Sequence, residues 1–376
     1  MTPELNMRIG IDARITYYAR GGIRNYVLHL LQALAGVDAD TDYYVLHSRK
    51  DRSPPLPGPN FHPLACWTPS HHRLERWALG MEIARLGLDL VHSTDFIPPA
   101  WGYCRSVITV HDLNFLHYPQ FITPESHRYY TRQIAWAVRR ASHVLADSHA
   151  TLSDLVSLLK VRPEKITVVH LAADPAFRPL PEARAAQVAA RYNLEPGYLL
   201  FVGTLEPRKN LPGLLQAYRD LLDAQVTTAP LVVVGGKGWL YDEIFERVAA
   251  LRLTDQVRFL HDVPDDDLPG LYNAASLLTT PSFYEGFGLP ALEAMACGTP
   301  TVASGTTSLP EVCGEGALLV PPQDEVALAE ALHRLATDET LRHDLRARGI
   351  AQAARFPWSE TARKTACLLY TSPSPR

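Results

Sequence analysis

Two glutamates lie eight residues apart in a glycine-containing turn and in the helical segment that follows it. Glu285 precedes Gly286 and Gly288, and Glu293 lies within Pro290–Ala296, which has the composition of a helix. Glycine lets a ligand approach the backbone closely, and the unpaired N–H groups of a helix start can bind an anion. A helix terminus stabilises an anion by only about 0.3–1 kcal/mol. We therefore expect a cation to assist this site.

Arg208 and Lys209 are the candidate cations. They lie in Gly203–Leu211, directly after the apolar run Tyr198–Gly203. A guanidinium binds phosphate oxygens in pairs, whereas a lysine ammonium supplies a compact point charge. An Arg-Lys pair in a loop is often only a solvated turn. Its position between a strand and the helix expected at Leu211–Leu222 favours a phosphate site.

The first half of the chain offers weaker candidates. Gly21 and Gly22 precede a helical pattern that starts near Ile23, and His111 ends the apolar run 107–111. A glycine pair is as typical of a structural turn as of a phosphate loop. A single histidine more often has a structural role, but its position at the carboxyl end of a strand favours a ligand contact.

These residues depend on strands that recur between amphipathic segments in two series. Short apolar runs rich in β-branched residues are typical of strands buried on both faces, as in parallel sheets. The first series is 7–13, 43–47, 89–93, 107–111, 143–147 and 166–170, and the second is 198–203, 231–235, 257–260, 277–280, 301–304 and 317–320. The proline-containing stretch 172–196 separates them. The pattern predicts an α/β protein with two doubly wound domains.

The composition excludes several classes of protein. The chain has 376 residues, 47% hydrophobic and 20% charged, which argues against disorder. A net charge of −4 disfavours a nucleic-acid binder. The five cysteines form no Cys-x-x-Cys pair, which favours a reducing compartment. Met1–Arg8 has no apolar signal core, and no later stretch approaches the roughly 20 apolar residues of a bilayer span. We expect a cytoplasmic protein that contacts a membrane, if at all, peripherally from its cytoplasmic side.

Together, the motifs resemble the retaining glycosyltransferases of family 4. The matching segments are Gly21–Tyr26, Thr109–Pro119, Ala146–Leu155, Gly203–Leu211 and Tyr284–Ser304, and their order and spacing are specific. Glu285 and Glu293 match the family's E-x7-E element. The resemblance implies the GT-B fold, in which two Rossmann-like domains face each other across a cleft, and a nucleotide-sugar donor.

The resemblance also implies roles for individual residues. Glu293 would bind the ribose hydroxyls, and Arg208 and Lys209 would bind the diphosphate and stabilise it as a leaving group. Glu285 would hold hydroxyls of the donor sugar, and His111 would contact that sugar from the other domain. The implied catalytic residues are therefore His111, Glu285, Lys209 and Arg208. The implied donor-binding residues are Gly21, Gly22, Thr204, Arg208, Lys209, Glu285, Gly286, Phe287, Gly288, Leu289 and Glu293.

Two positions depart from the family pattern. Arg24 stands where many members have glycine, and Thr204 stands where many have arginine after the strand glycine. The second departure leaves more of the phosphate charge to Arg208 and Lys209.

The resemblance divides the chain into an N-terminal acceptor-side domain, 1–178, and a C-terminal nucleotide-sugar domain, 195–356. A helix at 357–369 would return to the N-terminal domain, and we exclude the proline-containing end, 370–376, from functional argument. The implied reaction transfers a hexose, mannose from GDP-mannose being the favoured choice, to a glycan or lipid-linked acceptor. The alternatives are a related nucleotide-sugar epimerase or phosphorylase, and a non-catalytic nucleotide-sugar binding module.

Three further motifs have simpler interpretations. Asp265–Asp267 contains an Asp-x-Asp pattern but reads as an acidic helix start, so we expect no metal and no cofactor. Val232–Gly238 lacks the spacing of a phosphate loop and fits a turn beside the donor site. Arginines alternate with aromatic residues in 127–143 and in 71–85. These segments are either solvated helix faces or a surface that meets lipid phosphates or anionic headgroups.

Overall fold

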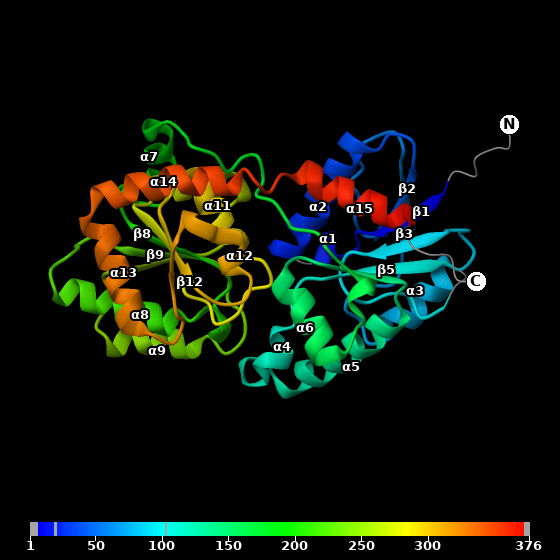
Figure 1. The fold of residues 1–376 in the computed structure, drawn as a ribbon, viewed down its shortest axis with the longest axis horizontal. Coiled ribbons are helices and arrows are strands. Elements are labelled where there is room, and N and C mark those ends of the chain that lie inside the picture. Colours follow the sequence, from blue (N-terminus) through cyan, green and yellow to red (C-terminus); the bar gives the residue numbers. More distant parts are fainter. Residues whose placement is uncertain (1–6, 19–20, 102–103, 372–376) are drawn as a thin grey trace. The chain divides into compact units, whose positions relative to one another are not determined.

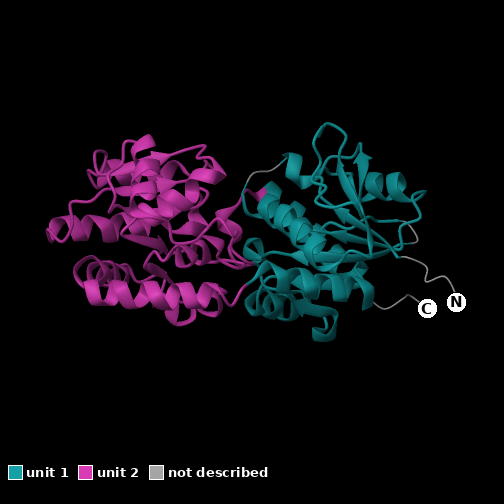
Figure 2. Cartoon of the chain, turned by 90° about the horizontal axis from the view of Figure 1, so that it is seen from above, with its two compact units in different colours: residues 1–116, 125–171, 357–376 teal, residues 117–124, 172–356 magenta. Residues whose placement is uncertain are grey.

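The computed structural model describes residues 7–18, 21–101 and 104–371, and they form two compact units (Figure 2). Unit 1 comprises the described residues up to Leu116, Glu125–Leu171 and those from Pro357 onward. Unit 2 comprises His117–Pro124 and Ala172–Phe356. The sequence-based boundaries differ at two places, because 117–124 and 172–178 group with unit 2 rather than with the N-terminal domain.

Unit 1 is built on a seven-stranded parallel sheet with the order β3-β2-β1-β4-β5-β6-β7. Its strands are β1 (Arg8–Asp12), β2 (Asp42–Ser48), β3 (Phe61–Cys66), β4 (Leu90–Ser93), β5 (Arg105–Val110), β6 (His143–Ala146) and β7 (Ile166–Val168). Its main helices are α1 (Ile15–Tyr18), α2 (Gly22–Val37), α3 (Glu75–Ile83), α5 (Pro124–Arg140), α6 (His149–Leu159) and α15 (Trp358–Thr371), while the short α4 (Asn114–His117) ends at the unit boundary.

Strand β3 is absent from the series of strands that the sequence predicts. It is an edge strand, and only its first and last residues, Phe61 and Cys66, are buried, so it forms no continuous buried apolar run. It also contains Pro63, which has no N–H to donate to a neighbouring strand and is tolerated at a sheet edge. For both reasons β3 lacks the continuous apolar run that predicts the other strands.

Unit 2 contains a six-stranded parallel sheet with the order β10-β9-β8-β11-β12-β13. Its strands are β8 (Leu199–Val202), β9 (Leu231–Val234), β10 (Val257–Leu260), β11 (Leu277–Thr280), β12 (Thr301–Ser304) and β13 (Leu318–Val320). Its helices are α7 (Glu182–Arg191), α8 (Leu211–Asp223), α9 (Asp242–Ala250), α10 (Leu268–Ala274), α11 (Leu289–Cys297), α12 (Leu309–Cys313), α13 (Glu325–Thr337) and α14 (Glu339–Ala353). All six predicted strands of this half are present.

Successive residues of the central strands of unit 2 belong to different cores. Leu199 and Phe201 of β8 pack in one apolar cluster with residues of α8, α9 and α13. Leu200 of the same strand packs in a second cluster, which includes residues of α7, α10 and α11. Helices therefore cover both faces of the sheet (Figure 1), which explains why β8 and β9 are apolar at every position.

Each sheet has one place where the direction of winding reverses. In unit 1, β4 pairs with β1 after the chain has wound outward through β2 and β3, and in unit 2, β11 pairs with β8 in the same way. The loops after two such neighbouring strands diverge, and ligands of open α/β sheets bind in the space between them. In unit 2 these loops are 203–210 and 281–288.

The last helix, α15, packs against α2 of unit 1. The Trp358 ring lies 5.3 Å from the His29 ring, and Thr361 Oγ1 donates a hydrogen bond to the carbonyl of His170. Of the segment set aside as 370–376, residues 372–376 lie outside the described residues, and α15 ends at Thr371. Among the described residues, no helix combines the length and the apolar character needed to cross a membrane.

Candidate active site

Arg208, Lys209 and Glu285 form a compact ionic cluster at the winding reversal of unit 2. Lys209 Nζ donates to Glu285 Oε1 at 2.7 Å, and Arg208 Nη1 donates to Glu285 Oε2 at 3.0 Å. Ser282 Oγ donates to Glu285 Oε1 at 2.7 Å, and Arg208 Nη2 donates to Glu206 Oε1 at 2.6 Å. The structure thus brings together the three charged residues that the sequence singled out in the loops after β8 and β11.

Backbone and amide hydrogen bonds hold these two loops together. Arg208 and Lys209 lie in the 3-10 turn η3 (Pro207–Lys209), which ends at Asn210 in a left-handed conformation. The Asn210 amide donates to the carbonyls of Pro281 and Pro322, at 3.1 and 2.7 Å. The Phe283 N–H donates to the carbonyl of Arg208. Asparagine adopts this conformation readily, so Asn210 both ends the turn and fixes the position of the cations.

The cluster stabilises the ionised form of Glu285. Its side chain is only 6% exposed, and burial alone would raise its pKa. The charges of Lys209 and Arg208, with hydrogen bonds from Lys209 and Ser282, outweigh this and lower the pKa to about 2. Glu285 is therefore a carboxylate that neutralises part of the positive charge of this loop.

The turn between Glu285 and α11 has a fixed conformation. Gly288 precedes α11 with φ +99°, and a Cβ there would lie 2.6 Å from Leu309 Cδ2. Ser308 Oγ lies 2.9 Å from the carbonyl oxygens of both Glu285 and Phe287. The Glu285 N–H donates to Thr307 Oγ1 at 3.1 Å. Gly286 and Phe287 are buried, and Leu289 begins α11 half-buried.

Glu293 lies in α11 and has different partners. Its Oε2 accepts a hydrogen bond from the Tyr272 hydroxyl at 2.8 Å. Burial, together with the carboxylates of Asp174 and Asp265, raises its pKa to about 7 despite that hydrogen bond. Glu285 and Glu293 thus share one sequence element but have opposite electrostatic environments.

The glycine and threonine candidates lie at strand-to-helix connections. Gly21, with φ +92°, precedes α2, and Gly22 is the first residue of that helix. Apart from their neighbours along the chain, no described residue has an atom within 4 Å of a Cβ placed on either glycine, so close packing with other described residues requires neither. Thr204 follows β8 and is exposed.

His111 lies directly after β5, and unit 1 occupies both of its ring nitrogens. Nδ1–H donates to Asp147 Oδ2 at 2.7 Å, and Nε2–H donates to the Thr94 carbonyl at 2.9 Å. Burial would lower the pKa of His111, but Asp147, Asp95 and the Thr94 carbonyl raise it to about 9. These interactions favour the protonated imidazole. A sugar contact would have to replace one of these hydrogen bonds.

Several partners of these residues were missed in the sequence, namely Glu206, Ser282, Asn210, Tyr272, Asp147 and Thr94. A signal existed for Asp147. Val110 of β5 pairs with Ala146 of β6. His111 and Asp147 are the residues that follow these two, so they lie side by side. The order of the strands would have been needed to use that signal.

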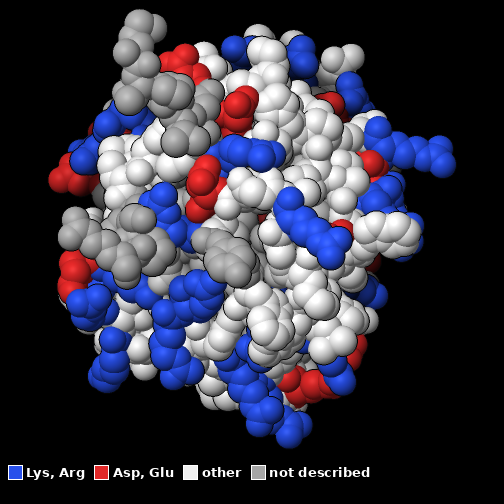
Figure 3. Space-filling model, turned by 90° about the vertical axis from the view of Figure 1, so that its right-hand side faces the viewer, with Lys and Arg blue, Asp and Glu red and all other residues white. Residues whose placement is uncertain are grey.

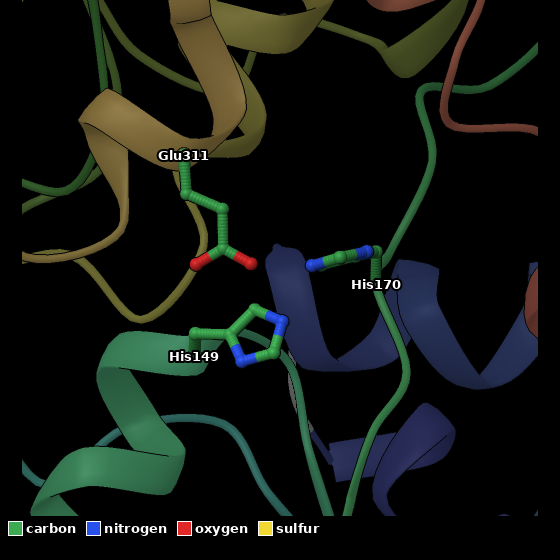
Figure 4. Close-up of side chains that lie close together, drawn as sticks. All are labelled: His149, His170 and Glu311. Atoms are coloured by element: carbon green, nitrogen blue, oxygen red, sulfur yellow. The ribbon is translucent and has the colours of Figure 1, made fainter.

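Two further histidines of unit 1 lie near each other, as Figure 4 shows. His149 begins α6 and His170 follows β7, and their ring centroids are 6.0 Å apart. Glu311, also drawn there, belongs to α12 of unit 2. A structural zinc ion takes four ligands. Among the described residues, neither unit by itself contains a group of three close His, Cys, Asp or Glu ligands.

The two remaining motifs of unit 2 have structural contacts. Asp265–Asp267 forms the 3-10 turn η4 before α10, and Asp267 accepts hydrogen bonds from Arg191 and from the Tyr192 hydroxyl. In the turn after β9, the backbone of Lys237 forms an isolated parallel β-bridge with that of Leu205. The Lys237 ammonium lies 5.0 Å from the centre of the Tyr241 ring.

Comparison with known proteins identifies the family of this chain. Residues 185–352 match the family model "Glycosyl transferases group 1", and residues 20–177 match "Glycosyltransferase Family 4". The O-antigen chain mannosyltransferase B of Escherichia coli is 36% identical over 297 residues, covering 78% of this chain and 76% of that protein. The chain belongs to the group 1 glycosyltransferases.

Two further similar proteins agree with this assignment. The serotype-specific mannosyltransferase WbdA of Escherichia coli is 31% identical over 269 residues. The matched region covers 69% of this chain but only 32% of that protein. The sucrose-phosphate synthase of Thermosynechococcus elongatus superposes with a TM-score of 0.79 at 25% identity, covering 97% of this chain and 98% of that one. The glycosyltransferase identity and the GT-B fold that the sequence predicts are confirmed.

Proposed function

We propose that this glycosyltransferase transfers mannose from GDP-mannose to a glycan or lipid-linked acceptor in polysaccharide or glycoconjugate synthesis, with retention of the anomeric configuration. The observation that carries the proposal is the Arg208–Lys209–Glu285 cluster, which lies where open α/β sheets bind ligands. The choice of mannose is supported by the related proteins that are named mannosyltransferases.

In this proposal the donor diphosphate competes with Glu285 for the two cations. An ammonium has three N–H donors, and Lys209 uses one of them for Glu285 among the described residues. The remaining donors are available to diphosphate oxygens. Glu285 keeps Arg208 and Lys209 in place without a ligand, and it would then accept hydrogen bonds from the sugar hydroxyls.

The leaving group requires positive charge when the sugar bond breaks. The bond from the anomeric carbon to the diphosphate oxygen breaks, and the acceptor hydroxyl oxygen bonds to the same face of that carbon. The hydroxyl proton passes to the departing phosphate oxygen. Arg208 and Lys209 would stabilise the charge on that diphosphate, and no metal ion is needed in this scheme.

The remaining residues would position the donor. The Glu293 carboxylate is proposed to accept hydrogen bonds from the ribose hydroxyls. Gly21, Gly22, Thr204 and the backbone from Gly286 to Leu289 are proposed as further donor contacts, with unit 2 as the nucleotide-sugar domain and unit 1 as the acceptor domain. His111 is proposed to contact the transferred sugar in place of its hydrogen bond to Thr94.

We further propose that the protein acts in the cytoplasm and contacts the cytoplasmic face of a membrane peripherally. All five cysteines are free thiols, which agrees with a reducing compartment. A lipid-linked acceptor would require access to such a surface.

A donor screen tests the proposal. A ligand that binds the native state raises the melting temperature, so GDP-mannose should raise Tm more than other nucleotide sugars. Acceptor-dependent release of GDP should follow, and NMR of the product should show the anomeric configuration of the donor. Conversion of GDP-mannose without an acceptor would instead indicate an epimerase.

Replacement of Lys209 tests the assigned diphosphate site. Hydrogen bonds to charged groups contribute about 1.5–3 kcal/mol, so Lys209→Ala should weaken GDP-mannose binding by about one to two orders of magnitude. Lys364→Ala removes the same charge from α15, where the lysine pairs only with Glu360 at 3.6 Å in the described structure, and should bind the donor normally. Unchanged donor affinity in folded Lys209→Ala protein would refute the assignment.

A further inference from the structure

A groove of about 440 Å³ lies in unit 1 between the start of α3 and the helix α5. Four arginines and one glutamate line it, namely Arg73, Arg76, Arg128, Arg132 and Glu125. All of these side chains belong to unit 1, and the groove takes no residue from the ionic cluster of unit 2.

The groove has an excess of positive charge. Arg73 pairs with Glu125 at 2.6 Å, but both side chains are largely exposed, at 81% and 75%, so this pair holds neither group firmly. Figure 3 draws the side of the protein that lies on the right in Figure 1, and basic side chains gather along its lower edge. Four guanidinium groups against one carboxylate leave a groove that favours an anion with several oxygens.

Arg76 is the most constrained of these arginines. Its guanidinium carbon lies 5.1 Å from the Trp77 ring centre and 4.8 Å from the Trp136 ring centre. Its Nη1 donates weakly to Gln133 Oε1 at 3.4 Å, and its buried Nε–H has no acceptor among the described residues. A buried donor without a partner is destabilising. The groove thus contains a guanidinium that two aromatic rings hold in position.

Exposed apolar side chains lie beside the groove, on α3, just before it at Leu74, and at Trp101. Leu74, Trp77 and Met81 follow the i, i+3, i+7 spacing of one helix face and are 60%, 39% and 66% exposed. Trp101 is 53% exposed, and its ring packs 5.0 Å from that of Trp77. A soluble phosphate ligand would not require such a face. Tryptophan and other large apolar side chains beside arginines are typical of surfaces that lie at the headgroup level of a bilayer.

We propose that the arginine groove and the apolar face of α3 together bind an anionic phospholipid surface, with headgroup phosphates in the groove and Leu74, Trp77, Met81 and Trp101 at the acyl boundary. This inference rests on the proposed peripheral membrane contact and identifies the surface through which the protein would contact the membrane. It is independent of the identity of the donor.

Vesicle binding by the full-length protein tests the inference. Each arginine near an anionic surface contributes about 1 kcal/mol, so R128A/R132A should bind phosphatidylglycerol-containing vesicles about thirtyfold more weakly than the unmodified protein. R52A/R363A removes two exposed arginines of unit 1 that belong neither to the groove nor to the helices α3 and α5, and it should bind nearly as well as the unmodified protein. M81S should weaken binding to neutral and anionic vesicles alike.

The other outcomes are equally informative. Equal losses in R128A/R132A and R52A/R363A would indicate non-specific charge attraction and overturn the groove. Binding of inorganic diphosphate that depends on Arg128 and Arg132, without any vesicle binding, would indicate a soluble anion site and overturn the membrane surface. GDP-mannose thermal shifts separate the two proposals, because R128A/R132A should retain the shift of the unmodified protein.

Discussion

Glu285→Gln removes the negative charge of the unit 2 cluster while keeping the size of the side chain and one of its two hydrogen-bond-accepting oxygens. The pKa of Glu285 falls from an ordinary 4.5 to about 2 in the folded protein, and one pKa unit corresponds to about 1.4 kcal/mol. The ionised carboxylate therefore contributes up to about 3 kcal/mol of stability at neutral pH. Because the folded-state pKa is lowered, this stability is complete above pH 4.5 and is lost as the pH falls towards 2.

Urea denaturation at a series of pH values measures this contribution. Glu285→Gln should be about 3 kcal/mol less stable at neutral pH, and the difference from the unmodified protein should shrink below about pH 4.5. Glu330→Gln, an exposed site on α13, should follow the unmodified protein throughout. A difference between Glu285→Gln and the unmodified protein that did not change with pH would refute the reasoning.

The same variant tests the competition between Glu285 and phosphate. Without the carboxylate, Arg208 and Lys209 lose an internal counter-charge. GDP should then bind about tenfold more tightly by calorimetry, while transfer to an acceptor slows because the sugar hydroxyls lose a partner. Weaker GDP binding by folded Glu285→Gln would contradict this competition.

Three further perturbations have defined outcomes. Protonated His111 stabilises the folded protein by up to about 3 kcal/mol, because its folded-state pKa is raised to about 9. This stabilisation is complete below pH 6.5 and is lost as the pH rises towards 9. His111→Gln should remove it, and urea denaturation at a series of pH values would measure the loss. Gly288→Ala should lower the free energy of unfolding by about 1–3 kcal/mol in denaturant titrations, because it adds a Cβ at a positive φ and against Leu309. Gly36→Ala should not lower it, because an added Cβ would meet no other described residue at this position in α2. EDTA should leave transfer activity unchanged, and loss of activity that Mn²⁺ restores would show that a metal is required.

The strands were predictable wherever helices cover both faces of the sheet. Leu199, Leu200 and Phe201 are all buried because the two faces of β8 pack in different cores, so the sequence is apolar without interruption. The edge strand β3 lacks that environment and was missed. The assignment of 117–124 to unit 2 was also missed, since no local pattern indicates that Tyr118 packs against Phe283.

The charged residues of the candidate site were predictable because each follows a strand of a parallel sheet. Arg208, Lys209 and Glu285 met as expected once β8 and β11 proved to be neighbours. Their neutral partners were not predictable, because serine and asparagine are common in turns and Ser282 and Asn210 have no distinctive spacing. The electrostatic contrast between Glu285 and Glu293 depends on three-dimensional neighbours and required the structure.

The division of the chain into units has a consequence for expressing them separately. The backbone leaves one unit for the other after Leu116, Pro124, Leu171 and Phe356, so no single cut separates two complete halves. A fragment that stops at Leu171 would lack α15 and would expose the surface of α2 on which it packs. A self-sufficient N-terminal half would therefore need the terminal helix grafted back through a linker, or supplied as a separate peptide in trans.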